Sequence, residues 1–478
     1  MNQSQRDLAA ERVCVAGHHV LSIVSRDENP AQRKRALADL EAALPSPASV
    51  ASVDGRVTAV VTTPDFHPGR PVPVGVVVAT EGVVLPHLIG NDIGCGMRMS
   101  VLRGVTVDDL ASRDVERALR RAFFQGGRDI AMTGADRFAL LREGLPGLLA
   151  SLRKSRTGTL ARIDLTRAEA DLERTCDLGV HWAPGVVPDF LDFADVAGGL
   201  RHDAIMGTIG GGNHFVEIGF VDHVAEGTAA RACRLGRGDV LLIVHSGSLD
   251  FGQRVGVRAS SDARDGPGPD KRVVPLGSAA ADRFLTGMAN AANAAFGNRF
   301  LLEAAATAAI GAAADREVVA ELVYDAPHNL AWVAGDRVVH RKGACPARGI
   351  SAMTGSPYAC TGEPVILSGS MGDGTWLLAG TGGNDPLQSA AHGAGRSLSR
   401  QEARRSPTDF ASLRIVGPVD LADPVLRRRP DILREAELRL REESPRAYRP
   451  IADVVDPMVS AGLVTRVAST RPLITVKG

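Results

Sequence analysis

A short glycine-rich stretch, residues 90–97 (GNDIGCGM), holds two side chains with different metal-binding chemistry. Asp92 offers a hard carboxylate and Cys95, three residues later, offers a soft thiol. Glycine tolerates positive φ and close backbone approach, so both side chains could turn toward one point. Four histidines far downstream each lie in a short motif of small and polar residues: His214, His245, His328 and His392. Their convergence on Cys95 would make a metal-dependent nucleotidyl-transfer site.

Each of these residues has a simpler interpretation when taken alone. A single cysteine is typically a small buried hydrophobe, and a single histidine is typically hydrogen-bonded within the structure. The four histidines, however, each follow a predicted strand or precede a glycine-rich turn, which is where distant segments meet at one sheet edge. A shared metal site is therefore predicted. One thiolate with imidazoles favours Zn²⁺, whereas adding Asp92 makes the site harder and allows Mn²⁺ or Fe²⁺.

His392 differs from the other three histidines. It lies in a Gly-Ala-Gly turn with Arg396 four residues later, and a helix is predicted to begin nearby. Helix N-termini and arginine side chains both favour phosphate. A histidine placed there suits a nucleophile toward phosphorus better than a metal ligand; the alternative is a histidine that caps the turn.

Composition limits the choice of partners. The chain has 478 residues, with 55 lysines and arginines and 55 aspartates and glutamates. No overall charge attracts nucleic acid, so RNA or DNA must be held by a local basic patch. The arginines between residues 107 and 175 could cover an RNA backbone, but a solvated helix face is the simpler interpretation.

Cysteine usage and the first residues predict a cytoplasmic location. The six cysteines are scattered and form no CxxC pair, as in reduced intracellular proteins. Residues 1–15 are polar and lack the apolar run of a signal peptide. No run approaches the roughly 18 apolar residues of a membrane span, so a membrane is not expected as a partner.

The elements that must position these residues alternate between helix and strand. Residues 1–30 are irregular in pattern, and the tail, 405–478, is rich in arginine and proline. Helical spacing covers 31–44, 115–123, 138–154 (interrupted at Pro146) and 278–316. Strands are predicted over 57–63, 72–80, 239–244, 318–324, 365–367 and 376–379, and a further strand carries His214, Val216 and Ile218. The length would allow about three domains, but nothing resembles a linker, so one large domain is equally allowed.

Nine motifs follow one another in a specific order: PDFHPG, NDIGCGM, GGGNHFVEI, HSGS, PHN, RKGA, GSMG, HGAGRSLSR and VKG. In this order they resemble the RtcB family of RNA-splicing ligases. The resemblance covers residues 31–478 and leaves 1–30 as an N-terminal extension of unknown role. It implies a single large α/β (α+β) domain of the RtcB type, with central β-sheets carrying the metal site and helices packed outside.

The resemblance also implies an activity. Members join RNA ends bearing a 2′,3′-cyclic phosphate or 3′-phosphate to 5′-hydroxyl ends, using GTP and Mn²⁺. Cys95 would bridge two Mn²⁺ ions, and the ligand set would be completed by Asp92, His214, His245 and His328. His392 would be guanylylated by GTP, with Asp65 orienting its ring, and the GMP would then pass to the RNA 3′-phosphate as an RNA-3′-pp-5′-G intermediate.

A guanylate pocket is carried over from the same motifs. Its residues would be Asn213, Glu217, Asn329, Ser368, Gly369, Ser370, Met371, Thr375, Gly393, Ala394, Gly395 and Lys477. Thr375 stands where a serine is usual in the family.

Several departures from the family pattern point to a divergent paralogue. Leu249 follows HSGS where an arginine is usual, Asn91 replaces an apolar residue, and residues 345–363 look longer than in typical members. The substrate could therefore come from RNA repair rather than tRNA splicing, and an archease-type activator protein is a further expected partner.

Two other functions compete with ligation. A metal-dependent phosphoesterase on the same scaffold would open cyclic phosphates without joining ends, but it would need neither His392 nor Lys477. A non-catalytic RNA-end-binding protein would not need an intact set of metal ligands and nucleophile.

Overall fold

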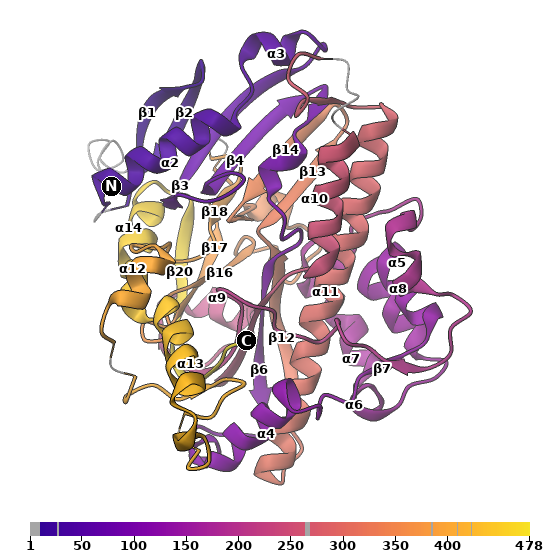
Figure 1. Cartoon of the computed structure of the whole chain (residues 1–478), viewed down its shortest axis with the longest axis vertical. Helices are drawn as coiled ribbons and strands as arrows, with labels where there is room; N and C mark the ends of the chain where they lie inside the picture. The colour runs from indigo at the N-terminus through magenta and orange to yellow at the C-terminus, as the bar shows by residue number, and fades with distance from the viewer. Residues whose placement is uncertain (1–9, 26–27, 263–267, 384–385, 409, 422) are drawn as a thin grey trace.

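Two large β-sheets with helices packed around them make up the protein (Figure 1). The computed structural model describes residues 10–25, 28–262, 268–383, 386–408, 410–421 and 423–478. The six-stranded sheet has the order β1 (Ala10–Val15), β2 (His18–Ile23), β3 (Arg56–His67), β4 (Val74–Glu81), β14 (Arg337–Lys342), β13 (Asn329–Ala334). The α/β (α+β) class expected from the sequence is confirmed.

The eight-stranded sheet carries most of the candidate chemistry. Its order is β12 (Val319–Pro327), β6 (Gly96–Arg103), β10 (Val240–Ser246), β9 (Phe215–Val224), β20 (Val464–Val476), β17 (Thr375–Gly380), β16 (Pro364–Ser368), with β19 (Ile415–Val416) beside β20. Three short ribbons pair β5 (Val83–Val84) with β11 (Val274–Pro275), β15 (Ala344–Pro346) with β18 (Ser389–Ala391), and β7 (Ala131–Met132) with β8 (Arg201–His202).

Helices cover the outside of the sheets (Figure 1). Those of nine or more residues are α2 (Pro30–Ala43), α4 (Arg113–Phe124), α5 (Gly134–Leu152), α10 (Asp250–Asp262), α11 (Ala279–Ala314), α13 (Pro430–Glu442) and α14 (Ala452–Ser460). The shorter ones are α3 (Pro47–Ala51), α6 (Gly158–Ala161), α7 (Leu165–Ala170), α8 (Leu191–Ala194), α9 (Gly227–Ala232) and α12 (Arg400–Arg405). None of the helices in the described part of the chain is long and apolar enough to cross a membrane.

The 36-residue helix α11 is the longest of these helices and packs against β6, β10 and β12. Ser278 caps its start by accepting a hydrogen bond from the Ala281 amide, and Asp315 ends it in the left-handed conformation. Alanines dominate its buried face, which lets the helix approach the sheet closely. Small side chains thus do much of the packing in a protein with only 4% aromatic residues.

Three local expectations need correction, and one strand of the tail was not expected. Residues 10–23 are not irregular, because they form the β1–β2 hairpin of the six-stranded sheet. Helix α5 runs through Pro146 and has its kink at Gly144 instead (φ 63°). No helix begins at the His392 turn, since the next helix starts at Arg400. The tail contains β20, an interior strand of the larger sheet. The domain boundary expected at residue 30 stays a prediction.

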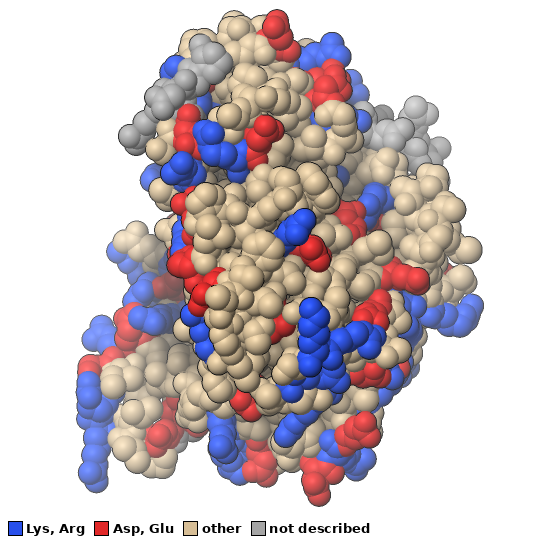
Figure 2. Space-filling model, turned by 90° about the vertical axis from the view of Figure 1, so that its right-hand side faces the viewer, with Lys and Arg blue, Asp and Glu red and all other residues tan. Residues whose placement is uncertain are grey.

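Charged side chains of both signs are interspersed on the face shown in Figure 2, apart from one group of basic residues in its lower half. Several arginines of the 107–175 region have acidic partners: Arg117 pairs with Asp114, Arg120 with Asp420 and Arg153 with Glu169. These pairs favour the solvated-face interpretation of that region over a dedicated RNA-binding surface.

Candidate functional site

The ends of four neighbouring strands bring the predicted metal ligands together along one side of the larger sheet, which is called the ligand edge here. Cys95 directly precedes β6 and His214 directly precedes β9, whereas His245 lies at the end of β10 and His328 follows β12. The neighbours in this set are antiparallel, so two strand starts and two strand ends meet at the ligand edge. In register, His245 lies opposite both Met97 and Phe215.

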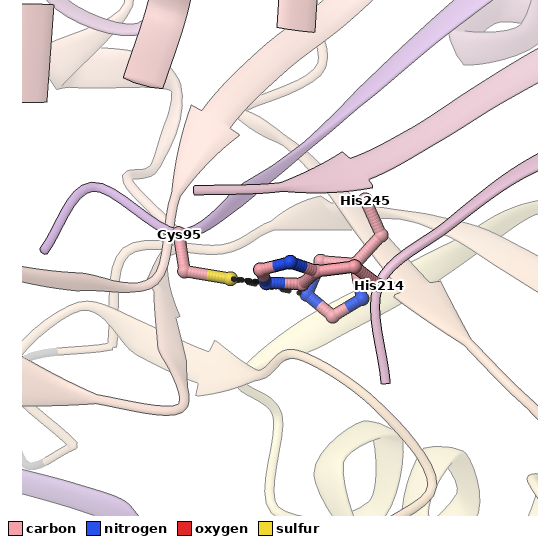
Figure 3. A group of neighbouring side chains, drawn as sticks. All are labelled: Cys95, His214 and His245. Carbon is pink, nitrogen blue, oxygen red and sulfur yellow. Dashed lines mark hydrogen bonds between the residues drawn. The ribbon is translucent and has the colours of Figure 1, made fainter. Parts of the chain in front are cut away.

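The side chains at the ligand edge converge on the Cys95 thiol (Figure 3). Its Sγ lies 3.3 Å from Nε2 of His214 and 3.3 Å from Nε2 of His245. The ligand atoms of these three residues all lie within 4.8 Å of one another. Asp92 joins through its Oδ2, 2.8 Å from His214 Nε2, and His328 through its Nε2, 3.4 Å from His245 Nε2. All five predicted ligands are therefore brought together.

The hydrogen-bonding state of the imidazoles fits a bound cation. Nδ1 of His245 donates to the Asn213 carbonyl (3.1 Å), which leaves the Nε2 lone pair facing Cys95 and His328. Nδ1 of His214 and of His328 is buried without a hydrogen-bond partner among the described residues. Burial and the neighbouring imidazoles lower the pKa of both His245 and His328 well below the usual value. Neutral imidazoles beside a thiol and a carboxylate are a metal donor set.

The pKa values of the two acidic members of the cluster shift in opposite directions. Burial raises the pKa of the Cys95 thiol well above its usual value, and the Asp92 charge adds to this shift. Burial also acts to raise the pKa of Asp92, but His214 and Cys95 outweigh it, so the pKa of this carboxyl is lowered. Gly247 of the HSGS motif is needed here, because a Cβ at that position would overlap Oδ1 of Asp92.

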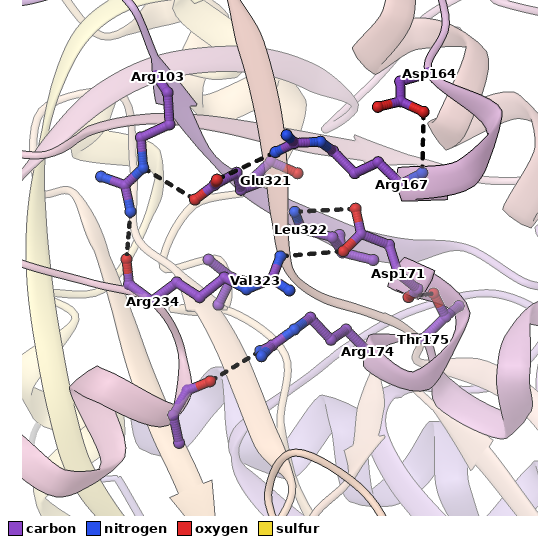
Figure 4. Close-up of polar contacts among 12 residues, drawn as sticks. Arg103, Asp164, Arg167, Asp171, Arg174, Thr175, Arg234, Glu321, Leu322 and Val323 are labelled. Atoms are coloured by element: carbon purple, nitrogen blue, oxygen red, sulfur yellow. Dashed lines mark hydrogen bonds and ion pairs between the residues drawn. The ribbon is translucent and has the colours of Figure 1, made fainter. Parts of the chain in front are cut away.

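The strand that leads into His328 is held from its outer side (Figure 4). As the first strand of its sheet, β12 would expose an unpaired edge. Instead, the Leu322 amide lies 3.5 Å from Oδ2 of Asp171, and Glu321 pairs with Arg167 (3.1 Å) of α7. The segment around α7 therefore covers the edge and fixes the position of β12.

His392 faces the metal cluster from a different part of the fold. It follows β18, and its Nδ1 lies 2.8 Å from Oδ2 of Asp65, near the end of β3 in the six-stranded sheet. Asp65 is fully buried, and the Thr63 hydroxyl donates to its other oxygen. The His392 ring centre lies 4.4 Å from that of His328. The contact predicted between Asp65 and His392 is thus present.

The residues predicted to hold guanylate lie around the ligand edge. Ser368 at the end of β16 forms a bridge with Gly393 and accepts a hydrogen bond from the Ala394 amide (3.0 Å). The Ser368 and Thr375 hydroxyls are 3.2 Å apart, and Gly369, Ser370 and Met371 lie in the turn between their strands. Asn329 instead bridges two backbone segments, since its amide donates to the Asp92 carbonyl and accepts from the Gly343 amide.

Lys477 and Glu217 lie together at the ends of β20 and β9. Lys477 Nζ donates to the Gly212 carbonyl (3.2 Å), and Glu217 lies 3.3 Å from the Thr475 hydroxyl. Burial raises the pKa of Glu217 to about 7 and lowers the pKa of Lys477. A cavity of about 1210 Å³ opens beside Lys477 and Gly212, but α4 and residues 404–443 form most of its lining, and neither His392 nor the metal ligands line it.

Sequence reasoning missed two charged residues of the site. Lys342, in the RKGA motif, lies close enough to Asp92 and Cys95 that both counteract the lowering of its pKa by burial. Glu443 is buried, 3.2 Å from Arg396 and 3.7 Å from Lys477. Arg396, expected to face phosphate, therefore pairs with Glu443. The motif could have revealed Lys342, whereas nothing in the sequence around Glu443 marks it.

The segment after HSGS also has a defined structure. Leu249 adopts a left-handed backbone (φ 55°) and packs beside Gly210, next to the His214 ring. Arg254, the nearest arginine along the chain, pairs with Asp192 (3.1 Å) and Asp250 (3.3 Å). Arg254 is therefore held by two carboxylates.

Comparison with known proteins identifies relatives along nearly the whole chain. Residues 47–478 match the family model described as "tRNA-splicing ligase RtcB". The chain is 31% identical over 469 residues to the RNA-splicing ligase RtcB of Mycobacterium bovis, covering 90% of this chain and 99% of that protein. It is 31% identical to the tRNA-splicing ligase RtcB of Thermococcus kodakarensis, covering 90% of each chain, and 30% identical to that of Pyrobaculum aerophilum, covering 87% of each.

Proposed function

Because the chain belongs to the RtcB family of tRNA-splicing ligases, we propose that it is an RNA ligase that uses GTP and two Mn²⁺ ions. It would join RNA ends bearing a 2′,3′-cyclic phosphate or 3′-phosphate to 5′-hydroxyl ends, in RNA repair or tRNA splicing. The observation that carries the proposal is the meeting of a five-residue metal donor set with a carboxylate-held histidine, His392, at the ligand edge.

The metal centre would be held by Cys95, Asp92, His214, His245 and His328. Bound Mn²⁺ would offset negative charge on the phosphates of GTP and RNA and align them for in-line attack. The thiol and the neutral imidazoles supply the donor atoms, and the Asn213 carbonyl fixes His245 in the tautomer that binds through Nε2. Mn²⁺ is proposed rather than Zn²⁺ because the resemblance to the RtcB family implies it and because the Asp92 carboxylate is a hard ligand.

His392 would act as the nucleophile toward GTP. Asp65 accepts a hydrogen bond from Nδ1–H of His392, so the Nε2 lone pair is free to attack the α-phosphorus. A nitrogen–phosphorus bond forms, the bond to the bridging oxygen breaks, and pyrophosphate leaves. The RNA 3′-phosphate then takes the GMP from His392, and attack by the 5′-hydroxyl forms the phosphodiester and releases GMP. A cyclic phosphate must first be opened by water.

The guanylate would be held around the strand ends that surround His392. Support comes from a few contacts: Ser368 bridges Gly393 next to His392 and contacts Thr375, and Asn213 and Asn329 contact ligand segments. The Ser368–Met371 turn, the Gly393–Gly395 turn, Glu217 and Lys477 would complete the pocket. All six cysteines are free, as expected in a reducing compartment, and we place the enzyme in the cytoplasm.

One gel assay tests this function against its two competitors. RNA with a 2′,3′-cyclic phosphate and a 5′-hydroxyl is incubated with the protein, GTP and Mn²⁺, beside a His392→Ala variant. A ligase gives joined product that disappears in His392→Ala. Opened but unjoined ends in both samples would indicate a phosphoesterase, and a mobility shift without chemical change would indicate an end-binding protein.

A further inference from the structure

Two adjacent side chains of α11 contact the chain segments that carry the predicted metal ligands. Asn298 accepts a hydrogen bond from the Gly207 amide (2.7 Å), at the start of the glycine-rich loop that leads to His214. Its Nδ2 lies within hydrogen-bonding distance of the Thr208 carbonyl (3.1 Å), the Ser246 hydroxyl (2.9 Å) and the Gly247 carbonyl (3.3 Å). Asn298 thereby connects the segment before His214 to the segment after His245.

Arg299 makes the corresponding contacts to the other ligand segments. Its Nη1 donates to the Gly94 carbonyl (2.7 Å), between Asp92 and Cys95, and to the Ser246 carbonyl (3.1 Å). Its Nε donates to Oδ1 of Asp325 (2.8 Å), three residues before His328. Arg299 is fully buried, as is Asp325.

The charge of Arg299 is balanced inside the core. Asp325 also pairs with Arg98 (3.4 Å), which in turn pairs with Glu303 (2.8 Å). Two guanidinium groups therefore face two carboxylates, so the network costs less than an isolated buried charge would. Removing either arginine would leave a buried carboxylate without its charged partner.

We propose that Asn298 and Arg299 are positioning residues that set the spacing of the ligand segments before any metal binds. The inference rests on the metal site of the proposed function. Three of the segments contain glycine next to the ligands (Gly94, Gly210–Gly212 and Gly247), and glycine-containing loops lose much entropy when ordered. By fixing the segments to one helix, the pair removes that cost from metal binding.

The same helix supplies a matched control. One turn and a half earlier along α11, Asn293 has the same kind of buried amide contacts: it accepts from the His181 amide (2.7 Å) and donates to the Leu141 and His181 carbonyls (3.0 Å each). The segment around His181 carries no predicted ligand. Asn293→Ala therefore removes a comparable set of buried hydrogen bonds away from the site.

The experiment compares Mn²⁺ binding to the full-length wild type, Asn298→Ala and Asn293→Ala by titration calorimetry, together with their melting temperatures. Both variants should lose similar thermal stability. The Mn²⁺ dissociation constant should rise on the order of 10- to 100-fold in Asn298→Ala only, which is the range for residues that orient metal ligands. In Co²⁺-loaded protein, the thiolate-to-cobalt absorption should weaken in the same variant. Equal Mn²⁺ affinity in the two variants would overturn the proposal.

Arg299→Lys provides a second test should Asn298→Ala fail to fold. A lysine keeps the positive charge beside Asp325 but cannot also reach both the Gly94 and Ser246 carbonyls. It should weaken Mn²⁺ binding to a similar degree, and wild-type affinity would contradict the inference. A wild-type protein that binds no Mn²⁺ would instead refute the metal site on which the inference rests, so the two failures are distinguishable.

Discussion

The link between Asp65 and His392 gives the sharpest prediction for the chemistry. Replacing Asp65 with asparagine keeps the size of the side chain but removes the charge that accepts the Nδ1 proton across 2.8 Å. A hydrogen bond to a charged group contributes roughly 1.5–3 kcal/mol. If that energy holds the reactive tautomer, guanylylation should slow roughly 10- to 150-fold. Asp65→Ala should slow it further, because the buried Nδ1 then lacks an acceptor.

The assay is label transfer from α-phosphate-labelled GTP to the protein, with Mn²⁺ and without RNA. The adduct should be a phosphoramidate, labile in acid and stable in base, and His392→Ala should abolish it. Thr62→Val is the matched control: Thr62 is fully buried in the same strand and its hydroxyl contacts Ser22 (2.7 Å) rather than Asp65. Wild-type guanylylation in Asp65→Asn, with Mn²⁺ affinity unchanged, would refute the reasoning, as would an adduct that survives in His392→Ala.

Three further predictions concern metal, RNA and pH. Cys95→Ala should remove both Mn²⁺ ions by elemental analysis, and binding should weaken at lower pH because the thiolate must form; activity supported by Zn²⁺ alone would contradict the Mn²⁺ assignment. Leu249→Arg should tighten RNA binding about tenfold, measured by fluorescence anisotropy, and leave guanylylation unchanged. Unaltered RNA affinity would show that an arginine at position 249 does not contact the RNA. Glu217 has a pKa of about 7 when folded against 4.5 when unfolded, so the unfolded chain releases the proton first and stability falls as pH rises between these values. The free energy of unfolding, measured with urea, should fall between pH 5 and pH 8 in the wild type. In Glu217→Gln this fall should be smaller by on the order of 3 kcal/mol. The same fall in both proteins would exclude Glu217 as its source.

The candidate site could be predicted from sequence because its ligands lie beside glycines and at the ends of apolar strands. His245 and His328 each follow an apolar run that predicts a strand, and His214 lies on a further predicted strand, so strand pairing can bring them together. The strand β6 that follows Cys95 was not predicted, because its sequence, GMRMSVLR, contains only one β-branched residue. Glu443 could not be found this way. Its partners Arg396 and Lys477 lie far from it in the chain, and it sits among other charged residues that pair on the surface of α13.

The elements that were missed have identifiable physical reasons. The strand β20 contains Pro472, which normally argues against an interior strand because proline lacks an amide donor. Irregular pairing with β9 between Pro472 and Ile474 accommodates it. The β1–β2 hairpin has exposed positions and weak alternation, and its only local signal is the turn at Ala16 and Gly17, both with positive φ.

The position of β20 has a consequence for how the molecule assembles. The strands β12, β6, β10 and β9 form one group and β17 with β16 another, and β20 lies between β9 and β17. Both groups precede β20 in the chain, so during synthesis on the ribosome each group is complete while β9 and β17 still present unpaired edges. Unpaired edges are templates for wrong association. Insertion of β20 is thus the step at which productive folding competes with aggregation, and a chaperone that shields these two edges would act before residue 464 emerges.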